Sequence, residues 1–153
     1  MITIDPPSSP LDELPAINKS ALTRFLNRAR ALVGLAGEVH VLLTSDAEIK
    51  RLNRTFRRKN KPTDILSFPT PSEISAQNAG DLAISLDTAA RQAAEHTHTL
   101  GDELRILILH GLLHLAGEDH EADSGQMAAR ELTLRRELKL KSTLIDRTER
   151  RVR

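Results

Sequence analysis

The spacing of apolar residues along the chain predicts a series of helices. Residues 18–33 carry an apolar residue every three or four positions and are followed by Gly34, which predicts an amphipathic helix that ends there. Ser45 and Glu48 form a capping-box pattern, so a second helix is expected to begin there and to reach Phe56. Three more helices are expected at 87–97, capped by Asp87, at 102–116 and at 124–141. The helix at 102–116 is apolar almost all round, which predicts a position at the centre of the fold.

Short apolar segments between these helices predict strands. They lie at 38–44 (EVHVLLT), 64–69 (DILSFP) and 81–86 (DLAISL), the last entered through Gly80. Residues 1–17, rich in proline and serine, are expected to form an extended lead-in, and residues 142–153 a flexible basic tail. Few strands with several helices predict one domain, 1–153, of the α+β class, with a small mixed sheet packed against helices.

The composition is that of an ordinary globular protein and excludes several classes of function. The 153 residues are 39% hydrophobic and 28% charged, as in soluble domains. The absence of cysteine excludes a disulfide scaffold, a cysteine-ligated metal and a thiol nucleophile. No segment is apolar enough to span a bilayer and no signal peptide is visible, so we expect a cytoplasmic protein without a membrane partner. Three Phe, no Trp and no Tyr disfavour an RNA binder that stacks bases on aromatic rings.

Charge is segregated along the chain although the net charge is only +1. Residues 50–61 (KRLNRTFRRKNK) contain seven Lys and Arg and no acidic residue, whereas residues 64–123 contain eleven acidic residues and two arginines. The basic block is either a patch for nucleic-acid phosphates or a solvated helix face that balances the acidic half. The C-terminal run RTERRVR is expected to be solvated, with contact to RNA as the alternative.

Half of the chain's six histidines fall within one short stretch, HGLLHLAGEDH. His110 and His114 lie four residues apart on the expected central helix, so their side chains share one face. Gly117 allows the chain to turn out of the helix and to return His120 toward them. Three imidazoles in this arrangement suit Zn²⁺ and leave a fourth position for water, which is typical of catalytic zinc.

The alternative is that these histidines are ordinary core or surface residues. Two imidazoles on a helix that is apolar all round need polar partners, which favours the metal site. The other histidines have plainer interpretations. His96 and His98 are expected to be solvated near a helix end, and His40 to lie on the less buried face of its strand.

The histidine spacing is close to the metzincin protease motif H-E-x-x-H-x-x-G-x-x-H. The general-base glutamate of those enzymes would fall at position 111, which is Gly111 here. A peptidase without this carboxylate lacks its proton shuttle, so the motif predicts different chemistry.

Three motifs in order resemble the YbeY family of bacterial rRNA maturation factors, which are single-strand-specific endoribonucleases. The histidine stretch resembles the family's H-G-x-L-H-L-x-G-Y-D-H and departs from it at Glu118, where a surface aromatic is replaced and no metal ligand is affected. Residues 52–69 (LNRTFRRKNKPTDILSFP) resemble its L-N-x-x-[YF]-R-x-K-[DN]-K-P-T-[DN]-[VI]-L-S-F-P. Residues 80–85 (GDLAIS) resemble its G-D-[IL]-x-I-S.

This resemblance implies a zincin-like α+β fold with a central metal-binding helix and one Zn²⁺ per chain. The implied ligands are His110, His114 and His120, and Arg57 is implied to face the metal cleft. The implied action is 3′-end maturation of 16S rRNA and ribosome quality control, with ribosomal RNA and the small ribosomal subunit as partners and no dinucleotide cofactor. Asp81 occupies a position linked in the family to a small-subunit protein, and a plain strand-entry carboxylate is the alternative.

The expected chemistry is phosphodiester hydrolysis. Zinc lowers the pKa of bound water to about 7 and polarises phosphoryl oxygens. Arg57 and His114 are expected to be catalytic. Arg57 suits this role because a guanidinium binds phosphate in a bidentate fork. A set of basic side chains is expected to hold the RNA backbone without reading its sequence, namely Arg54, Arg57, Arg58, Lys59 and Lys61. Asp119 is expected to orient a ligand histidine, with a turn residue as the alternative.

The sequence leaves the nucleophile and the general base open. A zinc-bound hydroxide, the RNA 2′-OH, or a carboxylate such as Glu118 or Asp119 would each serve. Two other functions remain. A ribosome-assembly factor that only binds would hold a structural zinc through a fourth protein ligand, such as Asp119, Glu118 or His96. A metallopeptidase is disfavoured by Gly111.

Overall fold

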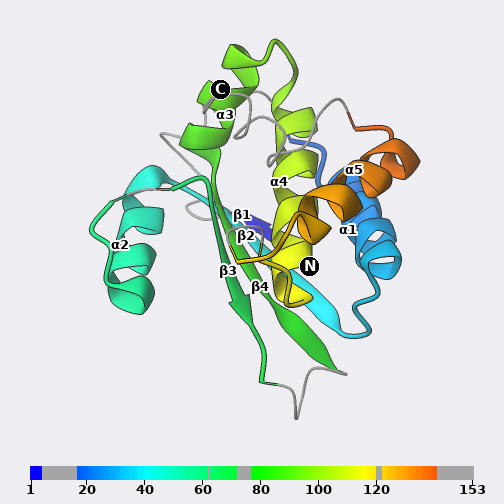
Figure 1. Ribbon diagram of the computed structural model, residues 1–153. Helices are drawn as coiled ribbons and strands as arrows, with labels where there is room; N and C mark the ends of the chain where they lie inside the picture. The colour runs from blue at the N-terminus through cyan, green and yellow to red at the C-terminus, as the bar shows by residue number, and fades with distance from the viewer. Residues whose placement is uncertain (5–16, 62, 72–76, 120–121, 141–153) are drawn as a thin grey trace.

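The computed structural model describes residues 1–4, 17–61, 63–71, 77–119 and 122–140, which form a mixed sheet covered by helices (Figure 1). The strands are β1 (Ile2–Ile4), β2 (Glu38–Thr44), β3 (Ile65–Pro69) and β4 (Asn78–Ser85). Their order in the sheet is β1-β2-β4-β3, with β1, β2 and β4 parallel and β3 antiparallel to β4 at one edge. The α+β class predicted from the sequence is confirmed.

The helices are α1 (Lys19–Val33), α2 (Asp46–Arg57), α3 (Leu86–Glu95), α4 (Leu100–Leu115) and α5 (Gln126–Leu138). In Figure 1, α1, α4 and α5 lie on one side of the sheet and α2 lies on the other. Twelve of the sixteen residues of α4 are buried, so α4 is the central helix that its apolar sequence predicted. None of the helices in the described ranges is both long and apolar enough to cross a membrane.

The first helix ends at Gly34 and the second begins after Ser45, as predicted. The Asn18 side chain accepts a hydrogen bond from the N–H of Ala21, and Gly34 ends α1 at a φ of 95°. The Ser45 side chain accepts from the N–H of Glu48 at the start of α2. These local signals were sufficient because the bonds that satisfy a helix end are made within one turn of it.

Three predictions at the ends of elements were wrong. Residues 2–4 of the expected extended lead-in form β1, a strand too short to show a pattern, which pairs in parallel with β2. β4 begins at Asn78, and Gly80 lies inside it, where a Cβ atom would come within 2.6 Å of the Phe68 carbonyl oxygen. Ser85, rather than Asp87, caps α3. The tail at 142–153 lies outside the described residues.

The two remaining helices differ slightly from their expected bounds. α4 begins at Leu100, two residues earlier than predicted, because Thr99 and Asp102 form a capping box. α5 is shorter at both ends than predicted and spans Gln126–Leu138 after Gly125.

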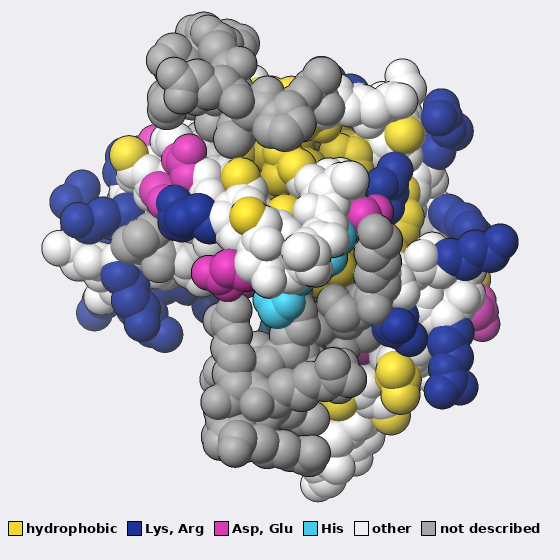
Figure 2. Space-filling view, turned by 90° about the horizontal axis from the view of Figure 1, so that it is seen from above, with side chains coloured by type: hydrophobic (Ala, Val, Ile, Leu, Met, Phe, Trp, Pro, Cys, Tyr) yellow, Lys and Arg dark blue, Asp and Glu magenta, His cyan; other side chains and the backbone are white. Residues whose placement is uncertain are grey.

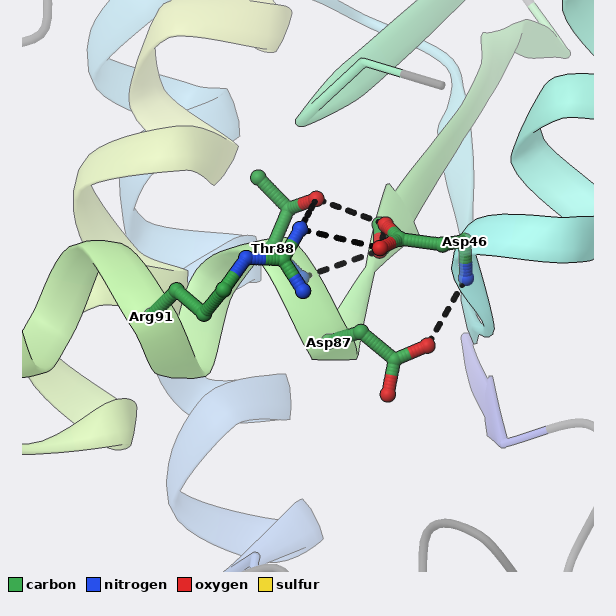
Figure 3. A network of polar contacts seen from close by, with 5 residues as sticks. Asp46, Asp87, Thr88 and Arg91 are labelled. Atoms are coloured by element: carbon green, nitrogen blue, oxygen red, sulfur yellow. Dashed lines mark hydrogen bonds and ion pairs between the residues drawn. The ribbon is translucent and has the colours of Figure 1, made fainter. Parts of the chain in front are cut away.

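Asp46 joins the N-termini of α2 and α3 at the carboxyl ends of the neighbouring strands β2 and β4 (Figure 3). Its carboxylate accepts hydrogen bonds from the hydroxyls of Ser85 and Thr88 and from Arg91, the last at 2.9 Å. Its backbone N–H donates to Asp87 at 2.9 Å. Burial raises the pKa of Asp46, but the three donors and the Arg91 charge outweigh it and hold the pKa below the ordinary value of an aspartate.

This network predicts a pH-dependent contribution to stability. Asp46→Asn should lower the free energy of unfolding by about 1–3 kcal/mol at pH 7, because charged hydrogen bonds are lost. A carboxyl whose pKa is lowered by folding stabilises the fold above its unfolded pKa of about 3.9 and loses that effect as the pH falls through the folded value. Urea denaturation should therefore show the difference at neutral pH and its decline below about pH 4. The exposed Glu38→Gln variant is the control, and a difference that is as large at pH 2 as at pH 7 would contradict the prediction.

Candidate active site

A cleft of about 470 Å³ opens beside the C-terminal half of α4. Its walls come from α4 and the loop after it, from the face of β3 that is turned toward α4, and from the end of α2. Its lining residues are Arg57, Lys59, Asp64, Ile65, Ser67, Pro69, His110, His114, Gly117, Glu118 and Asp119. Figure 2 shows the molecule from the end where α3 leads into α4, and in this view Lys and Arg side chains gather on the side of α2 and again on the opposite side.

His110 and His114 are brought together as the helical spacing predicted. The Nε2 atoms of the two rings lie 3.1 Å apart at the cleft, and their ring planes meet at 75°. His110 is buried, and its Nδ1 atom lies 3.0 Å from a carboxylate oxygen of Glu131 on α5. A carboxylate at Nδ1 favours the tautomer that carries its proton there, and the Nε2 atom of that tautomer has a lone pair, which faces His114 at the cleft.

This pair fits a zinc ion. Two ligand nitrogens placed at about 2.0–2.1 Å from a tetrahedral zinc are about 3.3 Å apart, close to the distance found between the two Nε2 atoms. Neutral imidazole is a preferred zinc ligand, and a carboxylate behind it is the usual arrangement around such ligands. The third predicted ligand, His120, lies outside the described residues. Within the described residues no third His, Asp or Glu completes a ligand group with the pair.

Glu131 is a side chain of the candidate site that was not predicted from the sequence. It lies on the buried face of α5 with Met127, Leu134 and Leu138. An acidic residue in an apolar stripe with helical spacing signals a buried partner, because an unpaired carboxylate is costly to bury. The sequence alone did not identify that partner. Asp119, which was expected to orient a ligand histidine, lines the cleft, and its role stays a prediction.

The loop after α4 is attached to α5 by an ion pair. Gly117, at a φ of 93°, turns the chain out of the helix, as predicted. Arg130 then donates to the Glu118 carboxylate at 2.7 Å and to the carbonyl oxygen of Val33. Glu118, which replaces the family's tyrosine, is therefore engaged by a cation. Of the three candidates for a fourth ligand, Asp119 and Glu118 line the cleft and His96 does not.

The basic block contributes two of its predicted residues to the cleft. Arg57 and Lys59 line it, and one Nη2–H of Arg57 donates to the carbonyl oxygen of Ser67 at 3.0 Å. Arg58 ends α2 at a φ of 57°, and this turn directs the following loop toward the cleft. Three other predicted RNA-binding residues are exposed but do not line the cleft, namely Arg54, Arg58 and Lys61.

Gly111 shows why no carboxylate occupies the position of the metzincin glutamate. A Cβ atom at this position would lie 2.7 Å from Ile65 and 2.8 Å from Leu82. The side chain would therefore point at β3 and β4 and not into the cleft. Glycine lets α4 approach the sheet closely, which brings the histidines next to β3.

Two other predicted residues lie on the opposite face of the sheet, and one histidine contradicts its prediction. Asp81 pairs in register with His40 on β2, away from the cleft, and His40 is half-buried as expected. The side chain of His98 was expected to be solvated but is only 3% exposed. Its Nε2 atom lies 2.7 Å from the carboxylate of Glu103 on α4. The ring lies in the interior because this buried carboxylate needs a polar partner.

Comparison with known proteins gives a consistent result. The family model described as endoribonuclease YbeY matches residues 8–139. A protein described as endoribonuclease YbeY from Koribacter versatilis is 54% identical over 136 residues, which cover 89% of this chain and 88% of that protein. One from Solibacter usitatus is 45% identical over 133 residues, with 87% and 88% covered. The solution structure of TM1509 from Thermotoga maritima superposes with a TM-score of 0.56 at 30% identity, covering 90% of this chain and 89% of that one.

The contact between His110 and Glu131 predicts a loss of stability that does not depend on metal. Glu131→Ala should lower the free energy of unfolding by about 1–3 kcal/mol, because it leaves a buried ring nitrogen without its carboxylate. Urea denaturation in the presence of a chelator measures the effect. Glu137→Ala, an exposed glutamate on the same helix, is the matched control. Equal stability of the two variants would contradict the assignment.

Proposed function

The chain belongs to the endoribonuclease YbeY family, and we propose that it cleaves single-stranded RNA in the cleft between α4 and β3 with the help of zinc. One observation carries this proposal. The cleft brings a pair of imidazole nitrogens and an anchored guanidinium into one cavity, from elements far apart in the sequence. Imidazoles suit a metal and a guanidinium suits a phosphate, so the cavity can accept a phosphodiester.

The proposed zinc ligands are His110, His114 and His120. The described pair supports this assignment through its nitrogen spacing and through Glu131, which holds the tautomer of His110. When bound, zinc supplies Lewis acidity toward a phosphoryl oxygen and lowers the pKa of water. The Arg130 ion pair to Glu118 restrains the loop that leads to His120.

Arg57 is the proposed electrostatic partner of the scissile phosphate. One of its five N–H donors is bonded to the Ser67 carbonyl oxygen, which fixes the guanidinium at the mouth of the cleft. No other hydrogen bond joins its side chain to the described residues, so the remaining donors can face a phosphate oxygen. A fixed cation stabilises the charge that develops on phosphate without the cost of reorienting. Lys59 adds a second charge to the same cavity.

The edge of β3 favours RNA over a peptide substrate. Ser85 donates its N–H to the carbonyl of Asp64, and the antiparallel register then turns the peptide groups of Ile65, Ser67 and Pro69 away from β4. A peptide held by strand addition would need those groups. The Ile65 N–H is bonded to the Asp64 carboxylate, the Ser67 carbonyl to Arg57, and proline has no N–H. This edge is therefore poorly suited to a peptide.

The proposed substrate is ribosomal RNA, in the maturation of the 3′ end of 16S rRNA and in ribosome quality control, in the cytoplasm. The family assignment supports this, together with the basic block beside the cleft. Asp81, exposed on the opposite face, is the proposed contact with a small-subunit protein. A binding factor with a structural zinc is the second candidate. It is less favoured because Glu118 is paired with Arg130 and His96 lies away from the cleft.

The zinc site predicts a graded loss of metal affinity. His114→Ala should abolish stoichiometric zinc binding, because it removes one of the two facing nitrogens. Glu131→Gln should weaken binding by about 10- to 100-fold, the usual effect of losing the carboxylate behind a ligand histidine. Competition with a chromophoric chelator measures both affinities, and Glu137→Gln should bind like the unmodified protein. Zinc bound equally by all four proteins would refute the site.

The proposed role of Arg57 predicts a loss of activity without a loss of metal. Arg57→Ala should retain zinc and reduce kcat/KM on a labelled single-stranded RNA by about 100-fold or more. His114→Ala and the exposed α1 variant Arg24→Ala are prepared identically, and Arg24→Ala should remain active.

Each other outcome has a definite meaning. Equal cleavage by all preparations would reveal a contaminating nuclease. Full activity of Arg57→Ala alone would exclude its role at the phosphate. If the unmodified protein cuts nothing, even with the small ribosomal subunit added, the binding-factor candidate replaces the enzyme.

A further inference from the structure

Two of the three phenylalanines come together on the face of the sheet opposite the histidines. Phe56 on α2 and Phe68 on β3 meet edge to face, with ring centroids 5.5 Å apart and planes at 70°. Phe56 is 64% exposed, which is unusual for so large an apolar side chain. The composition alone disfavoured base stacking, but this placement presents an aromatic ring to solvent in a defined position.

Phe56 forms one wall of a second groove, of about 490 Å³, between α2 and the sheet. We call it the Phe56 groove. Leu42 and Ala83, which are neighbours in register on β2 and β4, lie on its floor beside the next pair, His40 and Asp81. The lining residues are Thr3, His40, Val41, Leu42, Leu52, Phe56, Phe68, Asp81, Leu82 and Ala83. The groove is thus mostly apolar, and His40 and Asp81 lie at the end where Phe68 pairs in register with Asp81.

The Phe56 groove and the cleft share one wall. Successive residues of β3 alternate between them, since Ser67 and Pro69 line the cleft and Phe68 lines the groove. Successive residues of α2 do the same, with Phe56 in the groove and Arg57 in the cleft. The hydrogen bond from Arg57 to the Ser67 carbonyl lies at the strand edge between the two. A chain that leaves the cleft around this edge therefore meets the Phe56 ring.

We propose that the Phe56 groove binds one unpaired base of the RNA whose phosphodiester lies in the cleft, with the base stacked on Phe56. This inference rests on the proposed function and adds a subsite to it. A base held there is displaced from its neighbours, so it has to come from a single strand. The groove thus gives the protein a physical means of preferring unpaired RNA over a duplex.

Charge favours RNA over an apolar protein segment as the occupant. Phe56 is followed by three consecutive exposed cations, Arg57, Arg58 and Lys59, whereas the groove itself contains the Asp81 carboxylate. This distribution favours a ligand that places an anionic group at the rim and an uncharged flat group inside the groove. A nucleotide offers that combination, since each has a phosphate and a π-face. An apolar peptide would leave the cations at the rim without a partner.

Cleavage kinetics on a short labelled single-stranded RNA test the subsite. Phe56→Ala should raise KM by about 5- to 150-fold, the range that one base–aromatic stack contributes, and leave kcat unchanged. Phe56→Tyr should restore KM because it restores the ring, whereas Phe56→Leu should not, although it keeps the apolar bulk. Leu132→Ala, which truncates an exposed leucine on α5, is the matched control. Because Phe56 is exposed, its substitution should leave the protein folded. Thermal unfolding of each variant checks this.

A scan of abasic positions along the same RNA identifies the stacked base. For the unmodified protein, removing the base at one position should weaken RNA binding as much as the Phe56→Ala substitution does. For the Phe56→Ala variant, removing the same base should weaken binding no further, as expected for two groups in contact. Additive effects at every position would overturn the subsite even if cleavage is confirmed. Unchanged KM in Phe56→Ala, with loss of binding to the small ribosomal subunit instead, would assign the groove to a protein. If the unmodified protein does not cleave, fluorescence anisotropy on the same RNAs still decides whether Phe56 stacks a base.

Discussion

The fold is organised around one constraint: α4 is buried on all sides, yet it carries polar side chains that need partners. His110 and Glu103 lie inside the molecule, where an unpaired imidazole or carboxylate would be costly. Glu131 of α5 meets the first, and His98, from the segment before α4, meets the second. The segments packed against α4 therefore do more than cover apolar surface. They supply specific partners, and the partner of His110 also directs its other nitrogen into the cleft.

The close approach of α4 to the sheet has a second consequence. Gly111 lets the helix lie directly on Ile65 and Leu82, so that β3 becomes a wall of the cleft. α2 lies across the outer face of the same strand and is tied to α3 through Asp46 (Figure 3). Its last turn places one cation and one aromatic ring on opposite sides of β3. The thin strand edge thus separates a polar cavity from an apolar one, and a flexible anionic chain can reach both.

The sequence predicted most features that depend on neighbouring residues. The cap at Ser45, the helical pairing of His110 with His114 and the turn at Gly117 all follow from contacts within one or two turns. It failed at β1, which exists because a distant parallel partner was available. It also missed two local caps, Ser85 at the start of α3 and the capping box of Thr99 and Asp102 at the start of α4.

The sequence by itself determined the class of the fold and the residue types of the site, two facing histidines and a basic block. Tertiary structure decided which of those residues meet. It selected Arg57 and Lys59 from the basic block, introduced Glu131 as the partner of His110, and joined Phe56 to Phe68. The physical reason is that helix and strand periodicity specify the direction of a side chain relative to its own element only. Which element it then meets depends on how the layers pack around α4.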